Sequence, residues 1–179
     1  MGARVEFYST VFSTIDMRSF SNIWFWIAVA VGWSNITHFI IGVPFDMVLR
    51  ARRRGGQAMS DLEAMAVLQA RRRVQIMQSS GVWLVGFWTT VLSTLAVLGF
   101  VYGSELAQAL TLLLLPMSLA AALGLRLAAR LARAPLTEAA LTRKLTVHRL
   151  LIQALGLFAI LLTTMWGTLH NLSIPLLGL

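Results

Sequence analysis

Residues 81–125 read GVWLVGFWTTVLSTLAVLGFVY, then GSE, then LAQALTLLLLPMSLAAALGL. Neither apolar stretch contains Asp, Glu, Lys or Arg. A helix rises about 1.5 Å per residue, so about 20 apolar residues cross the roughly 30 Å hydrocarbon core of a bilayer. The two stretches therefore predict antiparallel membrane spans over 81–102 and 106–125, joined by a tight turn at Gly103-Ser104-Glu105.

The same pattern extends outward to two further stretches, 22–41 and 150–169, which also lack Asp, Glu, Lys and Arg. The whole chain is 58% hydrophobic and 12% charged, whereas a soluble domain is roughly 25% charged. So little charge cannot cover a water-facing surface. The sequence predicts an all-α, polytopic membrane protein: a single transmembrane domain over 1–179, with four transmembrane helices arranged as two hairpins.

The basic residues orient these spans. Thirteen of the fifteen Lys and Arg residues fall in two alternate connections, 42–80 and 126–149. Connections rich in Lys and Arg are retained in the cytoplasm. The two connections are therefore predicted to be cytoplasmic, which places the N and C termini on the non-cytoplasmic side.

Two segments outside the spans are also predicted to be helical. In the N-terminal segment 1–21, apolar residues from Val5 to Ile15 recur on one helical face, which predicts an amphipathic interfacial helix on the outer membrane surface. In the first connection, Ser60-Asp61-Leu62-Glu63 matches a capping box, which predicts that a helix begins there and runs through Arg71-Arg72-Arg73 into the second span.

The basic connections can bind anionic lipid head groups or an acidic partner, because cations near an anionic leaflet attract phosphates. The alternative is that they only orient and anchor the chain. Nucleic acid is not an expected partner, because the charge lies between membrane spans. The candidate docking residues are Arg50, Arg52, Arg53, Arg54, Arg71, Arg72, Arg73, Arg126, Arg130 and Arg133.

Histidines are the candidate cofactor ligands. His38 lies in the inner half of the first span, and His148 lies at the cytoplasmic start of the fourth. Such a pair could ligate haem or a metal, and His38 alone could be the axial ligand of a pigment such as bacteriochlorophyll. An intramembrane His near Asn35 is, however, more typical of polar helix packing. No cofactor and no metal site are expected, and the chain has no cysteine.

Small residues provide candidate helix contacts within the spans. Gly99 and Gly103 form a small-xxx-small motif at the outer end of the second span, and Ala120 and Gly124 form another in the third. Asn35 can donate a hydrogen bond to a neighbouring helix. The pattern does not distinguish contacts within one chain from contacts between subunits.

Two motifs carry a resemblance to a known family. Residues 16–26, DMRSFSNIWFW, and 42–48, GVPFDMV, resemble small membrane proteins of photosynthetic, Rhodobacter-like alphaproteobacteria that are often labelled "component of SufBCD complex". The resemblance covers about half of the chain and implies location in a bacterial inner membrane. The label could mean at most a membrane tether, since this chain has no thiolate for an iron–sulfur cluster.

The function expected from these features is that of a non-catalytic accessory, assembly or structural subunit in a larger inner-membrane complex, respiratory or photosynthetic. Its partners would be other integral membrane subunits and anionic phospholipids. No group of residues suggests an active site, so no enzyme activity is expected. Two alternatives are open: a small haem- or pigment-binding protein that uses His38, and a self-associating transporter or channel.

Overall fold

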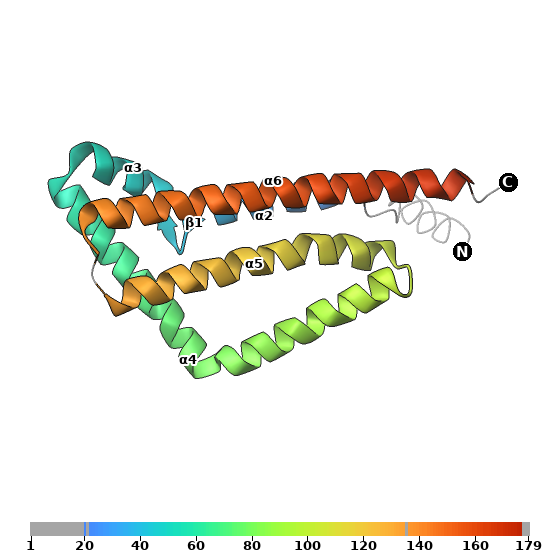
Figure 1. Ribbon diagram of the computed structural model, residues 1–179, viewed down its shortest axis with the longest axis horizontal. Helices are drawn as coiled ribbons and strands as arrows, with labels where there is room; N and C mark the ends of the chain where they lie inside the picture. The colour runs from blue at the N-terminus through green and yellow to red at the C-terminus, as the bar shows by residue number, and fades with distance from the viewer. Residues whose placement is uncertain (1–19, 21, 135, 177–179) are drawn as a thin grey trace, which may run out of the picture.

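The computed structural model describes residues 20, 22–134 and 136–176 (Figure 1). The predicted interfacial helix in 1–21 lies outside these residues, apart from Phe20. Within these residues the fold is almost entirely helical, with five helices and one two-stranded sheet. In chain order the elements are α2 (Ile23–His38), β1 (Phe39–Ile40), β2 (Val43–Pro44), α3 (Phe45–Arg54), α4 (Gly56–Phe100), α5 (Glu105–Arg133) and α6 (Glu138–Leu176).

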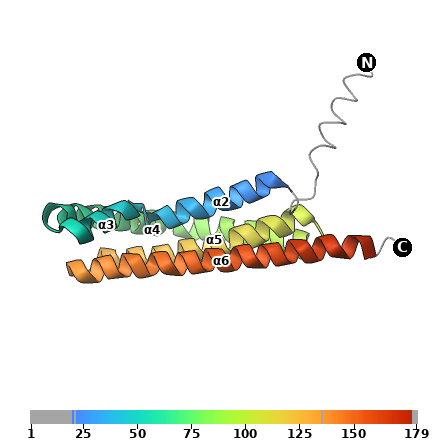
Figure 2. The same cartoon turned by 90° about the horizontal axis from the view of Figure 1, so that it is seen from above.

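Helices α5 and α6 run alongside one another, and the shorter α2 lies beside them in the middle of the molecule (Figures 1 and 2). At one end, here called the turn end, α4 is joined to α5 by residues 101–104. At the opposite end, here called the basic end, lie α3, the start of α4, the end of α5 and the start of α6. The basic end thus holds both of the connections that are rich in arginine.

Three of the described helices are long and apolar enough to cross a membrane: α4, α5 and α6. They contain the predicted spans 81–102, 106–125 and 150–169, although α4 ends at Phe100. Helix α2 has 16 residues, fewer than the predicted span 22–41. It is therefore about 24 Å long, which is shorter than the roughly 30 Å hydrocarbon core of a bilayer. A fourth span, the two-hairpin arrangement and the side on which the termini lie remain predictions.

A tight β-hairpin ends α2 early. Phe39 and Ile40 pair antiparallel with Pro44 and Val43. The two residues between the strands, Ile41 and Gly42, have φ of 49° and 86°, as a type I′ turn requires. Positive φ is unfavourable for a β-branched residue, but the Ile41 side chain is only 2% exposed, and its burial offsets part of that strain.

The molecule has two hydrophobic cores. The core at the basic end combines β1, β2, α3, the start of α4, the end of α5 and the start of α6, and it includes the fully buried Leu62, Leu145, Val43 and Val48. The second core lies between α2, α5 and α6 and is built around Val29, Trp33, Ala120, Ile152 and Ala159. The connections 42–80 and 126–149 are therefore packed structure and not simple loops.

Helix α4 begins at Gly56 and not at Ser60, so the predicted capping box is wrong. Gly55 and Gly56 have φ of 60° and 49° and already turn the chain into the helix. Ser60 lies inside the helix and donates its hydroxyl to the Gln57 carbonyl. The helix then continues without a break through Arg71-Arg72-Arg73, as predicted.

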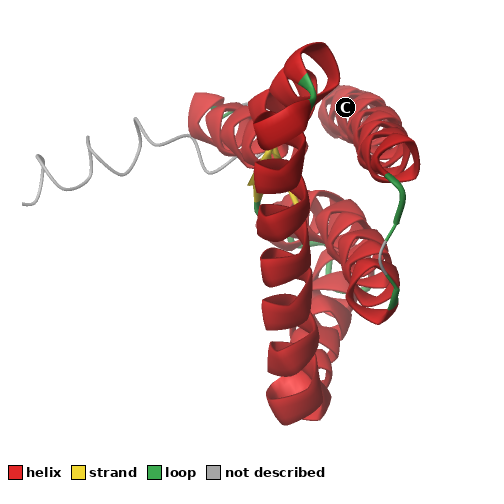
Figure 3. Ribbon diagram, turned by 90° about the vertical axis from the view of Figure 1, so that its left-hand side faces the viewer, coloured by secondary structure: helices red, strands yellow, loops and turns green. Residues whose placement is uncertain are grey.

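Helix α4 bends sharply about midway (Figure 1). Its middle contains Ser79-Ser80-Gly81, and the Ser79 hydroxyl donates to the Ile76 carbonyl at 3.2 Å; Ser and Gly in sequence commonly accompany such bends. The bend divides α4 into a first limb, residues 56–78, and a second limb, residues 82–100. Figure 3 shows the first limb crossing the basic end in front of the other helices.

Candidate functional site

The fold brings the two basic connections together at the basic end. Helices α3, α4, α5 and α6 each contribute Arg or Lys to it, and most of these side chains are exposed. Arg73, Lys144, His148 and Arg149 are instead half-buried. Of the candidate docking residues, Arg73 is thus the one that the structure draws into the protein, and the other nine lie exposed on α3, α4 and α5.

Gly124 on α5 lies beneath a junction of two basic side chains, one from α4 and one from α6. A Cβ atom built at Gly124 would lie 3.8 Å from Nη1 of Arg73 and 3.9 Å from Nε2 of His148. Arg73 comes from α4 and His148 from α6, so both side chains meet over the one position of α5 that has no side chain. Side chains from α4 and α6 therefore approach α5 at Gly124, near the cytoplasmic end of the third predicted span.

The electrostatics of this junction favour a neutral imidazole. Both residues lie outside the predicted spans, in the basic connections. Burial lowers the pKa of His148 below its ordinary value of 6.5, and the nearby Arg73 cation lowers it further. Burial also lowers the pKa of Arg73. A second cation beside Arg73 would be repelled, so the site suits an anion better than a metal ion.

Arg149 faces away from this junction, toward α3. Its guanidinium carbon lies 3.8 Å from the centre of the Phe45 ring, in cation–π geometry. Its Nε atom is buried and has no hydrogen-bond partner within the described part of the chain. Arg149 therefore packs α6 against the start of α3.

A cleft of about 750 Å³ opens between the end of α5 and the start of α6. Arg126 and Arg130 line it from α5, four residues apart and hence on one helical face. None of the described residues that line it is Asp or Glu. From α6 it is lined by three further basic side chains: Arg143, Lys144 and His148.

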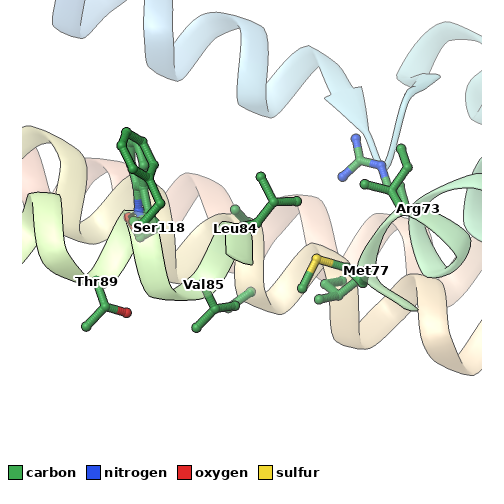
Figure 4. Close-up of a pocket in the computed structure, with 12 residues that line it drawn as sticks. Arg73, Met77, Leu84, Val85, Thr89 and Ser118 are labelled. Carbon is green, nitrogen blue, oxygen red and sulfur yellow. Dashed lines mark hydrogen bonds between the residues drawn. The ribbon is translucent and has the colours of Figure 1, made fainter. Parts of the chain in front are cut away.

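An apolar groove of about 590 Å³ separates the second limb of α4 from α5. In Figure 4, Arg73 and Met77 lie at one end of it and Thr89 and Ser118 at the other. The far end is closed by Trp88, whose indole N–H donates to the Ser118 hydroxyl at 2.6 Å. Arg73 is the charged residue among the described residues that line this groove.

The two candidate histidines have different surroundings. His38 is the last residue of α2, is exposed, and packs its ring edge-on against Phe39 at 4.8 Å. His148 faces Gly124 and Arg73 instead. The described residues contain no group of three or more His, Cys, Asp or Glu placed to hold a metal ion.

The candidate packing residues also differ in what they contact. Gly99 lies against the α5 backbone, because a Cβ there would be 2.8 Å from the Gln108 nitrogen. Ala120 is buried in the core between α2, α5 and α6. Gly103 has φ of 73° and no atom within 4 Å of a built Cβ, so it shapes the turn. Asn35 is exposed and donates within its own helix, to the Val31 carbonyl.

A polar contact that was not predicted from the sequence joins three helices at the turn end. The buried Gln108 donates from Nε2 to the Gly99 carbonyl at 2.9 Å. Its Oε1 accepts the indole N–H of Trp166 on α6 at 3.0 Å, and Trp166 packs edge-on against Phe100. The one available signal was a Gln within an apolar span, since such a side chain needs partners there.

Comparisons with protein families, with curated proteins and with solved structures find no match to this chain. The resemblance of residues 16–26 and 42–48 to alphaproteobacterial membrane proteins therefore remains a prediction. Function is accordingly argued from the packing and charge of the helices themselves.

Proposed function

We propose that this protein is a non-catalytic accessory, assembly or structural subunit of a larger respiratory or photosynthetic complex in a bacterial inner membrane. The observation that supports this function best is the exposure of the second limb of α4. In the most apolar window of α4, 6% of the residues are buried inside the protein, against 28% in the windows of α5 and α6.

The second limb contacts α5 at two places, and between Trp88 and the bend it is separated from α5 by the apolar groove. At the turn end it packs through Gly99, and further along it bonds through Trp88 to Ser118. The limb presents Trp83 and Phe87, which are 83% and 68% exposed and lie four residues apart on one helical face, and Phe87 also lines the groove. Large aromatic side chains are enriched at protein interfaces, so this face suits the transmembrane helix of another subunit.

The polar groups of the spans also favour a structural role. Thr90, Thr163 and Thr164 each donate to a backbone carbonyl four residues earlier in the same helix. Hydroxyls engaged in this way add no reactive group to the membrane interior. Because each hydroxyl is satisfied within its own helix, the exposed aromatic face is left as the main feature for recognition.

The decisive experiment is isolation of the tagged protein from its native membranes in a mild detergent, with mass spectrometry and an absorption spectrum of the product. A larger complex should co-purify at a fixed ratio. Visible absorbance that belongs to this chain alone would favour the haem or pigment alternative. A solitary homo-oligomer would favour the transporter or channel alternative.

A matched pair of variants connects the complex to the proposed face. Phe87 on α4 and Phe158 on α6 are 68% and 64% exposed, and both lie in the predicted spans. Phe87→Ala should reduce the amount of complex recovered, whereas Phe158→Ala should leave it unchanged. Equal recovery with both variants would exclude the second limb as the contact surface.

A further inference from the structure

The cleft between α5 and α6 has the charge of a phosphate site. Arg126 and Arg130 on α5 face Lys144 and His148 on α6 across it, with Arg143 beside them. On both helices the facing residues are four positions apart, so each helix presents its basic side chains in a row along its axis. Four of the five carry permanent charge, and no described lining residue is acidic, so an anion would relieve their mutual repulsion.

Gly124 allows a further cation, Arg73, to approach the inner end of the cleft. His148 lines the cleft, while Arg73 lines the groove on the other side, between α4 and α5. Because Gly124 has no side chain, both reach within 4 Å of a Cβ built there. The guanidinium of Arg73 thus adds to the field at His148 without entering the cleft.

The cleft also has an apolar part, which lies toward the predicted membrane. Leu123 on α5 and Leu151 on α6 line it beyond the cations and belong to the predicted spans. Leu127 and Val147 lie between these residues and the outermost basic side chains. Along both helices the lining therefore changes from apolar to cationic in the direction that leads out of the bilayer.

We infer that this cleft binds an anionic phospholipid, whose phosphate lies among the five basic side chains and whose glycerol and upper acyl chains lie against the leucines. Basic pockets between transmembrane helices on the cytoplasmic side are suited to such head groups. Arginine and lysine form strong charge-assisted hydrogen bonds to phosphate oxygens. A free phosphate would use the cations alone, whereas the apolar part of the cleft specifically fits a lipid.

The test uses the purified full-length protein in an uncharged detergent. Its thermal unfolding is followed while a short-chain phosphatidylglycerol, the matching phosphatidylcholine or glycerol phosphate is added, because a ligand of the folded state raises the unfolding temperature. Phosphatidylglycerol should stabilise saturably, phosphatidylcholine should not, and glycerol phosphate should act only at far higher concentration. Equal effects of the two lipids, or of phosphatidylglycerol and glycerol phosphate, would overturn the inference.

Paired variants locate the binding. Arg130→Gln with Lys144→Gln should weaken phosphatidylglycerol binding roughly 30-fold, since each cation near the lipid contributes about a factor of five. Arg52→Gln with Arg53→Gln removes the same charge from exposed positions on α3 at the same end and should change binding less than about twofold. Equal losses of phosphatidylglycerol affinity in the two double variants would mean that the lipid is attracted to the basic end in general. This result would overturn the assignment of the lipid to the cleft.

A third variant tests the cleft without any change in charge. Ala139 lines it and is exposed, so Ala139→Trp can fill part of the space with little disturbance to the core. Binding of phosphatidylglycerol should fall in this variant although every cation remains. Unchanged affinity would contradict occupancy of the cleft, and this result is informative even where the double glutamine variant fails to fold.

Discussion

The two limbs of α4 belong to one continuous helix but have opposite surroundings. The first limb buries Met59, Leu62, Ala66 and Ala70 along one face, and all four join the core at the basic end. In the second limb, residues 82–100, Gly99 is the buried residue, and large apolar side chains are exposed. The difference shows that hydrophobicity alone does not decide what a helix packs against, because the more apolar limb is the less buried one.

The largest expected effect comes from a matched truncation in the two limbs. Leu62 is fully buried, whereas Leu98 is 43% exposed. Leu62→Ala should lower the free energy of unfolding by about 2–5 kcal/mol, because it leaves a cavity, and Leu98→Ala by about 0.5 kcal/mol or less. Unfolding of the detergent-solubilised protein by denaturant measures both. Similar losses would mean that the two limbs are packed alike.

The next largest effect separates two glycines within the second limb. A Cβ at Gly99 would lie 2.8 Å from a backbone nitrogen, while Gly86 has nothing within 4 Å. Gly99→Ala should destabilise by about 1–3 kcal/mol, because α4 and α5 must move apart. Gly86→Ala should stabilise by up to about 1 kcal/mol through helix propensity. Thermal unfolding in detergent shows whether each variant is more or less stable than the wild type. A change of the same sign in both variants would contradict the close contact of Gly99 with α5.

A smaller effect is expected at the bond between Trp88 and Ser118. Trp88→Phe keeps an aromatic ring but removes the indole donor, which should lower the free energy of unfolding by about 0.6 kcal/mol. Ser118→Ala removes the same bond from the other side. The double variant should therefore lose less than the sum of the two single variants. Strict additivity would show that the bond does not hold the second limb to α5.

The smallest expected effect is the pH dependence that His148 adds at the basic end. Burial and Arg73 lower the pKa of His148 in the folded protein. The unfolded chain therefore binds more protons than the folded one, and the free energy of unfolding decreases as the pH decreases. His148 should therefore destabilise the fold progressively as the pH drops below the pKa of His148 in the unfolded chain, which is about 6.5. His148→Gln should show a shallower loss of unfolding temperature between pH 8 and pH 5. If the unfolding temperatures of the wild type and of His148→Gln fell in parallel over this pH range, the predicted contribution of His148 would be contradicted.

Much of the helical organisation could be predicted from the sequence, while the candidate sites could be predicted only in part. Uninterrupted apolar stretches located three membrane-length helices, and the arginine clusters identified the basic connections. The hairpin at Ile41 and Gly42 was missed, because an Ile with positive φ is stable only where the surrounding core buries it. The roles of Gln108 and Gly124 were also missed, since they depend on which helices meet there.

The sequence by itself determined that this is a helical protein with long apolar helices, because 20 residues without charge cannot be accommodated in water at low free energy. It also determined that thirteen of the fifteen Lys and Arg residues lie in two connections. Only the tertiary structure decided that these connections fold around a shared core, that Arg73 and His148 both approach Gly124, and that α4 bends so that its second limb meets α5 at the turn end. Each of these depends on contacts between residues far apart in the chain, whose geometry no local pattern of residues specifies.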